Sequence, residues 1–436
     1  MFAKMSIKLK ELVFSSTAKD TYISFLGNLF SAFWGFIFTL IVARKLSVSD
    51  FGVFSAVLNL VIILSSLADV GISTGSVKFI AENHTVGNKK KTDEYTKASF
   101  VIRTSIVIGL SLIVLMFPSF ISNHLLATTD PTMAMWAAFV SVFIFPVMFF
   151  PNILQAKRKF LESAFLDNSY YLGRLFITFV FSYFGILTMQ NAFWAFGVGF
   201  VVSIILTLVY VGKDFFYTKP SIDEYKNLMK FSWWIAVNRI ISSISGRLDV
   251  QMLAALAGAV ATGLYSIPSR LSSFLIVLAG SFSAVLAPRF ASFNDKKKEW
   301  SYILKSTLAL VPITFGIIIW IIFAKEFTVL LFGDKYIDSV PILKALLAAQ
   351  IPFLFTVPSV TAIIYAMKKT VYIGAFSFFQ IAAIFFLNVF FIPKYGPIGP
   401  TLTFGIVNII LAIYTWVIVI RYYLFSKEIA SEPQLK

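Results

Sequence analysis

The sequence has no cysteine, two histidines and few charged residues. Without cysteine, the 436 residues can form no disulfide, thiolate metal site or cysteine nucleophile. His84 and His124 lie in separate connecting segments without metal-ligand spacing. The chain also lacks a GxxxxGK[ST] phosphate loop, an HExxH motif and a large polar loop for catalytic acids. We therefore expect neither an enzyme nor a metal site or bound cofactor.

Apolar residues are what the sequence has in excess, at 58% of the chain and a mean hydropathy of +0.84. Soluble domains contain about 45–50% apolar residues, so this chain needs the membrane as its solvent. The formal net charge is +16. Most basic residues stand in short segments between apolar runs, where they orient a membrane protein, so nucleic acid is not an expected partner.

Twelve windows are long and apolar enough to cross a membrane, which takes about 20 residues. Runs of this length exclude barrel strands and predict helices, because helices satisfy their own backbone groups in lipid. We predict an all-α polytopic membrane protein of about 12 transmembrane helices. The windows are 21–43, 51–69, 98–117, 133–151, 165–185, 192–212, 228–247, 260–286, 303–324, 341–364, 371–392 and 398–424.

The connecting segments predict the orientation. With the N-terminus in the cytoplasm, 26 basic residues fall in cytoplasmic segments and 7 in outer ones. This bias predicts that both termini are cytoplasmic. The first apolar run exceeds the roughly 7–15 residues of a signal-peptide core, and we interpret it as a retained span. The segment 70–97 is expected to form an amphipathic helix at the membrane surface.

An internal repeat relates the two halves at a shift of 211 residues. It places Phe51–Ser55 over Thr262–Ser266, and Gly185 over Gly396. Chance alignment of apolar helices is the alternative explanation. Six helices in each half give both halves the same orientation, as in the parallel repeats of some transporters. We predict two six-helix lobes, 1–215 and 216–436, that rock around a central site.

Arginines within the spans are the main candidates for that site. A charge at the bilayer centre costs roughly 2.5–3.5 kcal/mol and usually faces a bundle interior or a water-filled path. Arg239, Arg270 and Arg174 lie deep in their spans, whereas Arg103 is expected to reach the nearby cytoplasmic edge. Either these arginines contact an anionic substrate, or they pair with acids or carbonyls inside the bundle.

Polar faces on several spans extend the candidate set. Asn28, Asn59 and Asn238 are proposed substrate contacts on faces of small and polar residues, which serve either helix packing or a water-lined path. Asp69, Arg247 and Asp249 are proposed for gating or ion pairing.

Several motifs resemble the polysaccharide transporter family, the Wzx-type O-antigen flippases of the multidrug/oligosaccharidyl-lipid/polysaccharide (MOP) exporter superfamily. The similar segments are the basic-LSxxDFGxF turn at 44–54, the DxG step at 69–71 followed by the basic-aromatic pair at 78–79, the stretch 247–266 and the YGPIGP turn at 395–400.

The resemblance implies a function. Such proteins move an undecaprenyl-diphosphate-linked oligosaccharide across the bacterial inner membrane for O-antigen, capsule or exopolysaccharide assembly. It also implies a MATE-like fold, a cationic lumen, H⁺ or Na⁺ coupling, and a polymerase and chain-length regulator as partners. Rival interpretations are a drug/cation antiporter, a peptidoglycan-precursor flippase, and a membrane enzyme or scaffold. The antiporter is disfavoured because the first span contains no acid.

Overall fold

The computed structural model describes residues 16–293 and 295–425, and these residues form helices joined by short connections, without a strand. Each predicted span falls on a helix, and the window 303–324 falls on two, α13 (Lys296–Leu308) and α14 (Val311–Ile322). Nine helical runs in the described part are long and apolar enough to cross a membrane, and one of them, Thr370–Leu424, contains two helices. The protein is therefore an all-helical polytopic membrane protein, as predicted.

The chain divides into two compact units between Ser243 and Ile244. The first contains α2 (Ser16–Lys45), α3 (Val48–Asp69), α4 (Ile72–Thr85), α5 (Lys89–Met116), α6 (Pro118–Leu125), α7 (Thr132–Ala156), α8 (Phe160–Tyr183), α9 (Met189–Tyr210), α10 (Asp214–Tyr217) and most of α11 (Ile222–Ser245).

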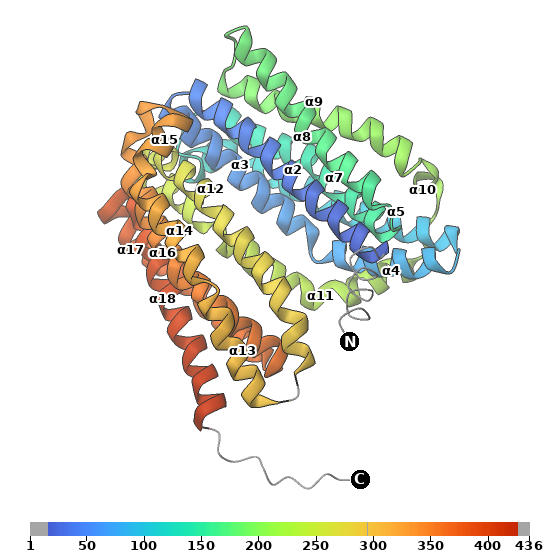
Figure 1. The fold of residues 1–436 in the computed structure, drawn as a ribbon. Coiled ribbons are helices and arrows are strands. Elements are labelled where there is room, and N and C mark those ends of the chain that lie inside the picture. Colours follow the sequence, from blue (N-terminus) through green and yellow to red (C-terminus); the bar gives the residue numbers. More distant parts are fainter. Residues whose placement is uncertain (1–15, 294, 426–436) are drawn as a thin grey trace, which may run out of the picture. The chain divides into compact units, whose positions relative to one another are not determined.

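Within the N-terminal unit, α8 packs between α2 and α9, while α7 packs against α3, α5 and α8 (Figure 1). The core around α4, α5 and α7 is rich in aromatic rings, among them Phe145, Phe149 and Phe150. The segment 70–97, expected to form an amphipathic helix, contains α4, which buries Ile72, Ser76 and Ile80 at helical spacing, and the first turns of α5. Its place at a membrane surface stays a prediction.

The second unit contains α12 (Leu248–Ser292), α13, α14, α15 (Ala324–Phe332), α16 (Val340–Thr361), α17 (Thr370–Tyr395) and α18 (Gly399–Ile420). Here α16 packs against α12 and α18, and α17 against α18 (Figure 1). Short 3₁₀ and π-helical segments separate these helices, namely η1 (Asp334–Ser339), η2 (Ala362–Ala366) and η3 (Gly396–Ile398), and η4 (Arg421–Phe425) follows α18.

The helix bounds follow the sequence repeat. At the shift of 211 residues, α8 falls on α17 and α9 on α18, each within one residue at its start. Gly258 has non-helical torsion angles inside α12, and the helix resumes at the residue that matches Val48, the start of α3. Gly185 and Gly396, which the repeat superposes, both have positive φ.

The compact units do not meet at the predicted lobe boundary of 215/216. The division lies farther along the chain because α11, which the repeat assigns to the second half, packs within the N-terminal unit. The predicted lobes 1–215 and 216–436, which follow from the repeat, stay a prediction.

Candidate functional site

Asp69 stands at a sharp turn between α3 and α4. Val70 and Gly71 both have positive φ, at 39° and 69°, and α4 begins one residue later. The backbone N–H and Oγ of Ser73 donate to Asp69 Oδ1, at 3.2 and 2.5 Å. The carboxylate therefore caps the first turn of α4, where the helix dipole favours negative charge.

Two arginines from other helices bind the same carboxylate. Arg103 on α5 places Nη1 3.2 Å from Asp69 Oδ1 and donates to Ser73 Oγ at 2.6 Å. Arg239 on α11 donates to Asp69 Oδ2 at 2.6 Å and to Thr74 Oγ1 at 3.3 Å. We call these five residues the Asp69 cluster. It contains two guanidinium groups for one carboxylate, so one positive charge is in excess.

The two arginines of the cluster differ in their surroundings. The Arg103 side chain is only 3% exposed and lies over the rings of Phe145 and Phe149. The Arg239 side chain is 48% exposed. Arg103 therefore serves as the interior partner of Asp69, while Arg239 is accessible and carries the excess charge.

Arg103 does not reach solvent, as snorkelling would require, because its side chain is buried and binds Asp69 and Ser73 inside the unit. Its place near the cytoplasmic edge stays a prediction. It was missed as a candidate because Asp69 and Arg103 lie on different spans, and helical spacing along one span does not reveal their contact.

Close packing of α4 on α11 brings Arg239 to Asp69. A Cβ atom at Gly71 would lie 2.9 Å from the carbonyl oxygen of Ser232 and 3.0 Å from the nitrogen of Ala236. One at Gly75 would lie 2.8 Å from Ser232 Oγ. Only glycine at these positions allows the two helices to approach so closely.

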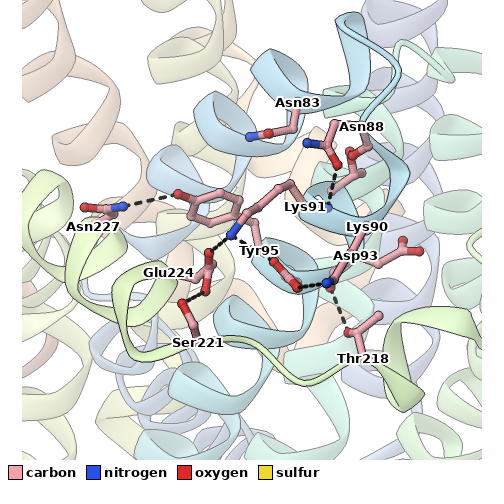
Figure 2. Close-up of polar contacts among 12 residues, drawn as sticks. Asn83, Asn88, Lys90, Lys91, Asp93, Tyr95, Thr218, Ser221, Glu224 and Asn227 are labelled. Carbon is pink, nitrogen blue, oxygen red and sulfur yellow. Dashed lines mark hydrogen bonds and ion pairs between the residues drawn. The ribbon is translucent and has the colours of Figure 1, made fainter.

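The start of α11 is held by polar contacts with α5 (Figure 2). Lys91 forms an ion pair with Glu224, and Ser221 Oγ donates to the same carboxylate at 2.6 Å. Asn227 Nδ2 donates to the hydroxyl of Tyr95 at 3.3 Å. Burial alone would raise the pKa of Glu224, but the hydrogen bonds from Lys91 and Ser221 outweigh it and lower the pKa. Contacts at the start of α11 and at Arg239 thus attach this helix to the rest of the N-terminal unit.

Arg174 occupies a different part of this unit. Its guanidinium lies 4.0 Å from the ring centre of Phe38 and 4.6 Å from that of Phe196, and the residue is 7% exposed. Tyr170 and Tyr171 complete an aromatic cage. No carboxylate of the described residues forms an ion pair with Arg174. Cation–π contacts therefore stabilise it, and its role as a substrate contact stays a prediction.

The other candidates are distributed over both units. Asn28 is exposed on α2, and Asn59 is buried in α3. Asn238 belongs to α11, but its side chain lies outside the described residues. These substrate contacts stay predictions.

In the C-terminal unit, the hydroxyl of Tyr265 donates to Asp249 at 2.7 Å. Arg247 is the exposed N-cap residue of α12, and Arg270 is half-buried on the same helix. The structure thus brings Arg239 together with Asp69 in one unit, whereas Arg247, Asp249 and Arg270 belong to the other.

No group of three or more His, Asp and Glu side chains within the described part of the chain could hold a metal ion. The chemistry that the Asp69 cluster offers is electrostatic: an accessible guanidinium next to a neutralised ion pair can bind an anion.

Two curated proteins are similar over most of the chain. An uncharacterized membrane protein in the cps region of Klebsiella pneumoniae is 23% identical over 433 residues, which cover 96% of this chain and 84% of that protein. The probable low-salt glycan biosynthesis flippase Agl15 of Haloferax volcanii is 22% identical over 348 residues, which cover 75% of this chain and 70% of that protein.

Solved structures show the same fold. The inward-facing conformation of a multidrug resistance MATE family transporter of the MOP superfamily superposes with a TM-score of 0.75 at 14% identity, covering 92% of this chain and 96% of that one. The lipid II flippase MurJ in an inward closed conformation gives a TM-score of 0.74 at 17% identity, covering 91% and 87%. The predicted MATE-like fold is thus confirmed.

The family predicted from the sequence motifs is confirmed as well. A family model described as "Polysaccharide biosynthesis protein" matches residues 17–294, which include both the Asp69 cluster and the aromatic cage around Arg174. Since this match spans more than half of the chain, the protein belongs to the polysaccharide biosynthesis protein family.

Proposed function

We propose that the protein is a flippase that moves an undecaprenyl-diphosphate-linked oligosaccharide across the bacterial cytoplasmic membrane for O-antigen, capsule or exopolysaccharide assembly. The observation that carries this proposal is the excess positive charge of the Asp69 cluster, on the accessible side chain of Arg239. A diphosphate is the anionic group of such a lipid. The planar fork of a guanidinium matches phosphate oxygens well.

The cluster allows Arg239 to change partners at low cost. A phosphate oxygen that replaces Asp69 on Arg239 leaves the carboxylate bound to Arg103 and Ser73. Asp69 is then never left as an isolated buried charge, which would be costly. Arg239 therefore serves as the first contact for the diphosphate, and Arg270 and Arg174 are candidates for later contacts.

Family and fold support the same interpretation. The family is named for polysaccharide biosynthesis, one relative is described as a glycan biosynthesis flippase, and MurJ is a lipid II flippase with this fold. The sequence repeat supports transport by alternating access of two lobes. H⁺ or Na⁺ coupling, cytoplasmic termini, and a polymerase and chain-length regulator as partners complete the proposal.

A drug/cation antiporter is the second candidate, because the MATE transporter has the same fold. The first span contains no acid, which disfavoured the antiporter in the sequence, but the folded protein weakens that objection. Ser31 of that span donates a hydrogen bond to Asp167 of α8, so a carboxylate does lie beside it.

Deletion of the gene in its host tests the proposal. We expect loss of surface polysaccharide and accumulation of lipid-linked repeat units on the cytoplasmic side, measured by lectin blotting and by protection of the glycan from external glycosidases. The wild-type gene should restore both, and an Arg239→Ala gene should not.

Three other outcomes of the deletion would contradict the proposal. Normal translocation of repeat units would exclude this flippase role. Raised drug susceptibility with unchanged polysaccharide would favour the antiporter. Accumulation of peptidoglycan precursors in place of repeat units would favour a precursor flippase.

A further inference from the structure

The N-terminal unit contains a second polar site, a pocket of about 230 Å³ bounded by α2, α7 and α8. Polar side chains from all three helices line it, among them Asn28, Asn152, Gln155 and Asp167. Drug-sized ligands occupy pockets of about 300–1,000 Å³, and one water takes about 30 Å³ of liquid. The volume therefore suits a single ring-sized group, not a whole oligosaccharide.

Asp167 is a carboxylate without a cationic partner. Ser31 Oγ donates to its Oδ2 at 2.5 Å. In residues 16–293 and 295–425, no Lys, Arg or His nitrogen lies within 4.0 Å of it. An ionised carboxylate accepts about four hydrogen bonds and is costly to bury without them. A ligand in this pocket must therefore supply hydrogen-bond donors.

The α7 side of the pocket offers further acceptors. Asn152 and Gln155 both lie on this helix and line the pocket. Asn152 Nδ2 donates to Met148 O at 2.7 Å, and Gln155 Nε2 donates to Ser163 Oγ at 3.2 Å. With the amides in these orientations, assigned from their hydrogen bonds, both side-chain oxygens are left to accept.

This chemistry distinguishes classes of ligand. An acceptor-rich pocket without a positive charge repels phosphate and suits a neutral group with many O–H donors. Tyr171 and Phe160 also line the pocket, so aromatic side chains stand among these acceptors. Hydroxyl donors around an apolar ring face are the features of a sugar.

We propose that this pocket binds one pyranose ring of the transported glycan, with sugar hydroxyls donating to Asp167. The inference rests on the proposed flippase function. The pocket involves the last turns of α7 and the first half of α8, next to the basic connection 157–159 that the charge bias predicts to be cytoplasmic. A glycan assembled on the cytoplasmic leaflet would meet this end of the unit first. Asn28, exposed on α2, contributes an amide to the same pocket.

Binding of a defined probe tests the pocket directly. The probe is the free oligosaccharide released by mild acid from the host's own lipid-linked repeat units, titrated into the purified full-length protein in nanodiscs. We expect Asp167→Asn to raise the Kd about tenfold or more, because it removes a charged acceptor. Asparagine retains an oxygen for Ser31, so the fold should persist, as an unchanged Tm would show.

The matched control is Glu162→Gln, on the same helix but outside the pocket. It should leave the Kd within twofold. An equal loss of affinity in both variants would overturn the proposal, because the effect would then be one of net charge. Stabilisation of the wild type by NaCl or choline chloride, with none by the oligosaccharide, would overturn it in favour of a cation site.

Failure of this inference can be told apart from failure of the proposed function. If the wild type translocates repeat units and does not bind the free oligosaccharide, the sugar pocket is excluded and the flippase function stands. If the deletion strain translocates normally, the flippase function fails, and the pocket is excluded as a site for a transported sugar.

Discussion

At the scale of single residues, the two arginines of the Asp69 cluster, Arg103 and Arg239, differ in exposure. Both bind Asp69, but only Arg239 is accessible. A buried guanidinium mainly stabilises the fold, whereas an exposed one contributes little to stability and is free to bind a ligand. The same residue type thus has two roles, and burial distinguishes them.

The two arginines should separate stability from transport. Arg103→Ala should lower the free energy of unfolding by about 3–5 kcal/mol, because it leaves a buried carboxylate with one partner fewer. Arg239→Ala should lower it by about 1 kcal/mol or less, yet abolish surface polysaccharide. Thermal unfolding in detergent and polysaccharide immunoblots of the same two variants provide the measurements. Equal losses of stability would refute this division of roles.

At the scale of elements, the position of α11 decides whether Arg239 reaches Asp69. The repeat makes it the counterpart of α2, but its contacts with α4 and α5 attach it to the N-terminal unit. The contact depends on two glycines, Gly71 just before α4 and Gly75 within it, that let the backbones approach. Helix packing thereby supplies the accessible arginine of a site whose carboxylate comes from α3.

Gly71 should therefore tolerate no side chain. Gly71→Ala strains a residue with positive φ, which costs about 1–2 kcal/mol. It also forces α4 from α11, which adds about 1–3 kcal/mol by overpacking. Gly87→Ala is the control, since Gly87 has the same sign of φ and a Cβ there would meet nothing within 4 Å. Thermal unfolding should show a clearly larger loss for Gly71→Ala, and equal losses would argue against close packing at this point.

At the scale of the whole molecule, the membrane orientation decides which end of each unit meets the cytoplasm. The excess of basic residues in alternate segments predicts this orientation. The sugar pocket and the Asp69 cluster acquire their proposed roles only if those segments are cytoplasmic, because the lipid-linked substrate is presented there.

The absence of cysteine makes the orientation directly measurable. A single cysteine at Lys90 or at Thr129, both exposed positions, reports its side of the membrane. A membrane-impermeant maleimide should label the Thr129→Cys variant in intact cells, and the Lys90→Cys variant only after permeabilisation. The reverse pattern would invert the topology and refute cytoplasmic termini.

The sequence alone predicted the membrane as solvent, the all-helical fold and the family. Apolar runs of about 20 residues can only be membrane helices, since nothing else satisfies their backbone in lipid. The depth of Arg239 and Arg174 within their spans marked both as candidates for contacts inside the bundle. Both contact partners within the N-terminal unit, although Arg239 is also accessible.

Only the tertiary structure decided which partners those were. Asp69, Arg103 and Arg239 lie on three different helices. Ser31 of α2 likewise donates a hydrogen bond to Asp167 on another helix, α8. Periodicity reports which face a residue occupies on its own helix but not which helix lies opposite. For Asp69 and Arg239, the pairing depends on the close approach of α4 and α11 at Gly71 and Gly75, and that is a property of packed helices in three dimensions.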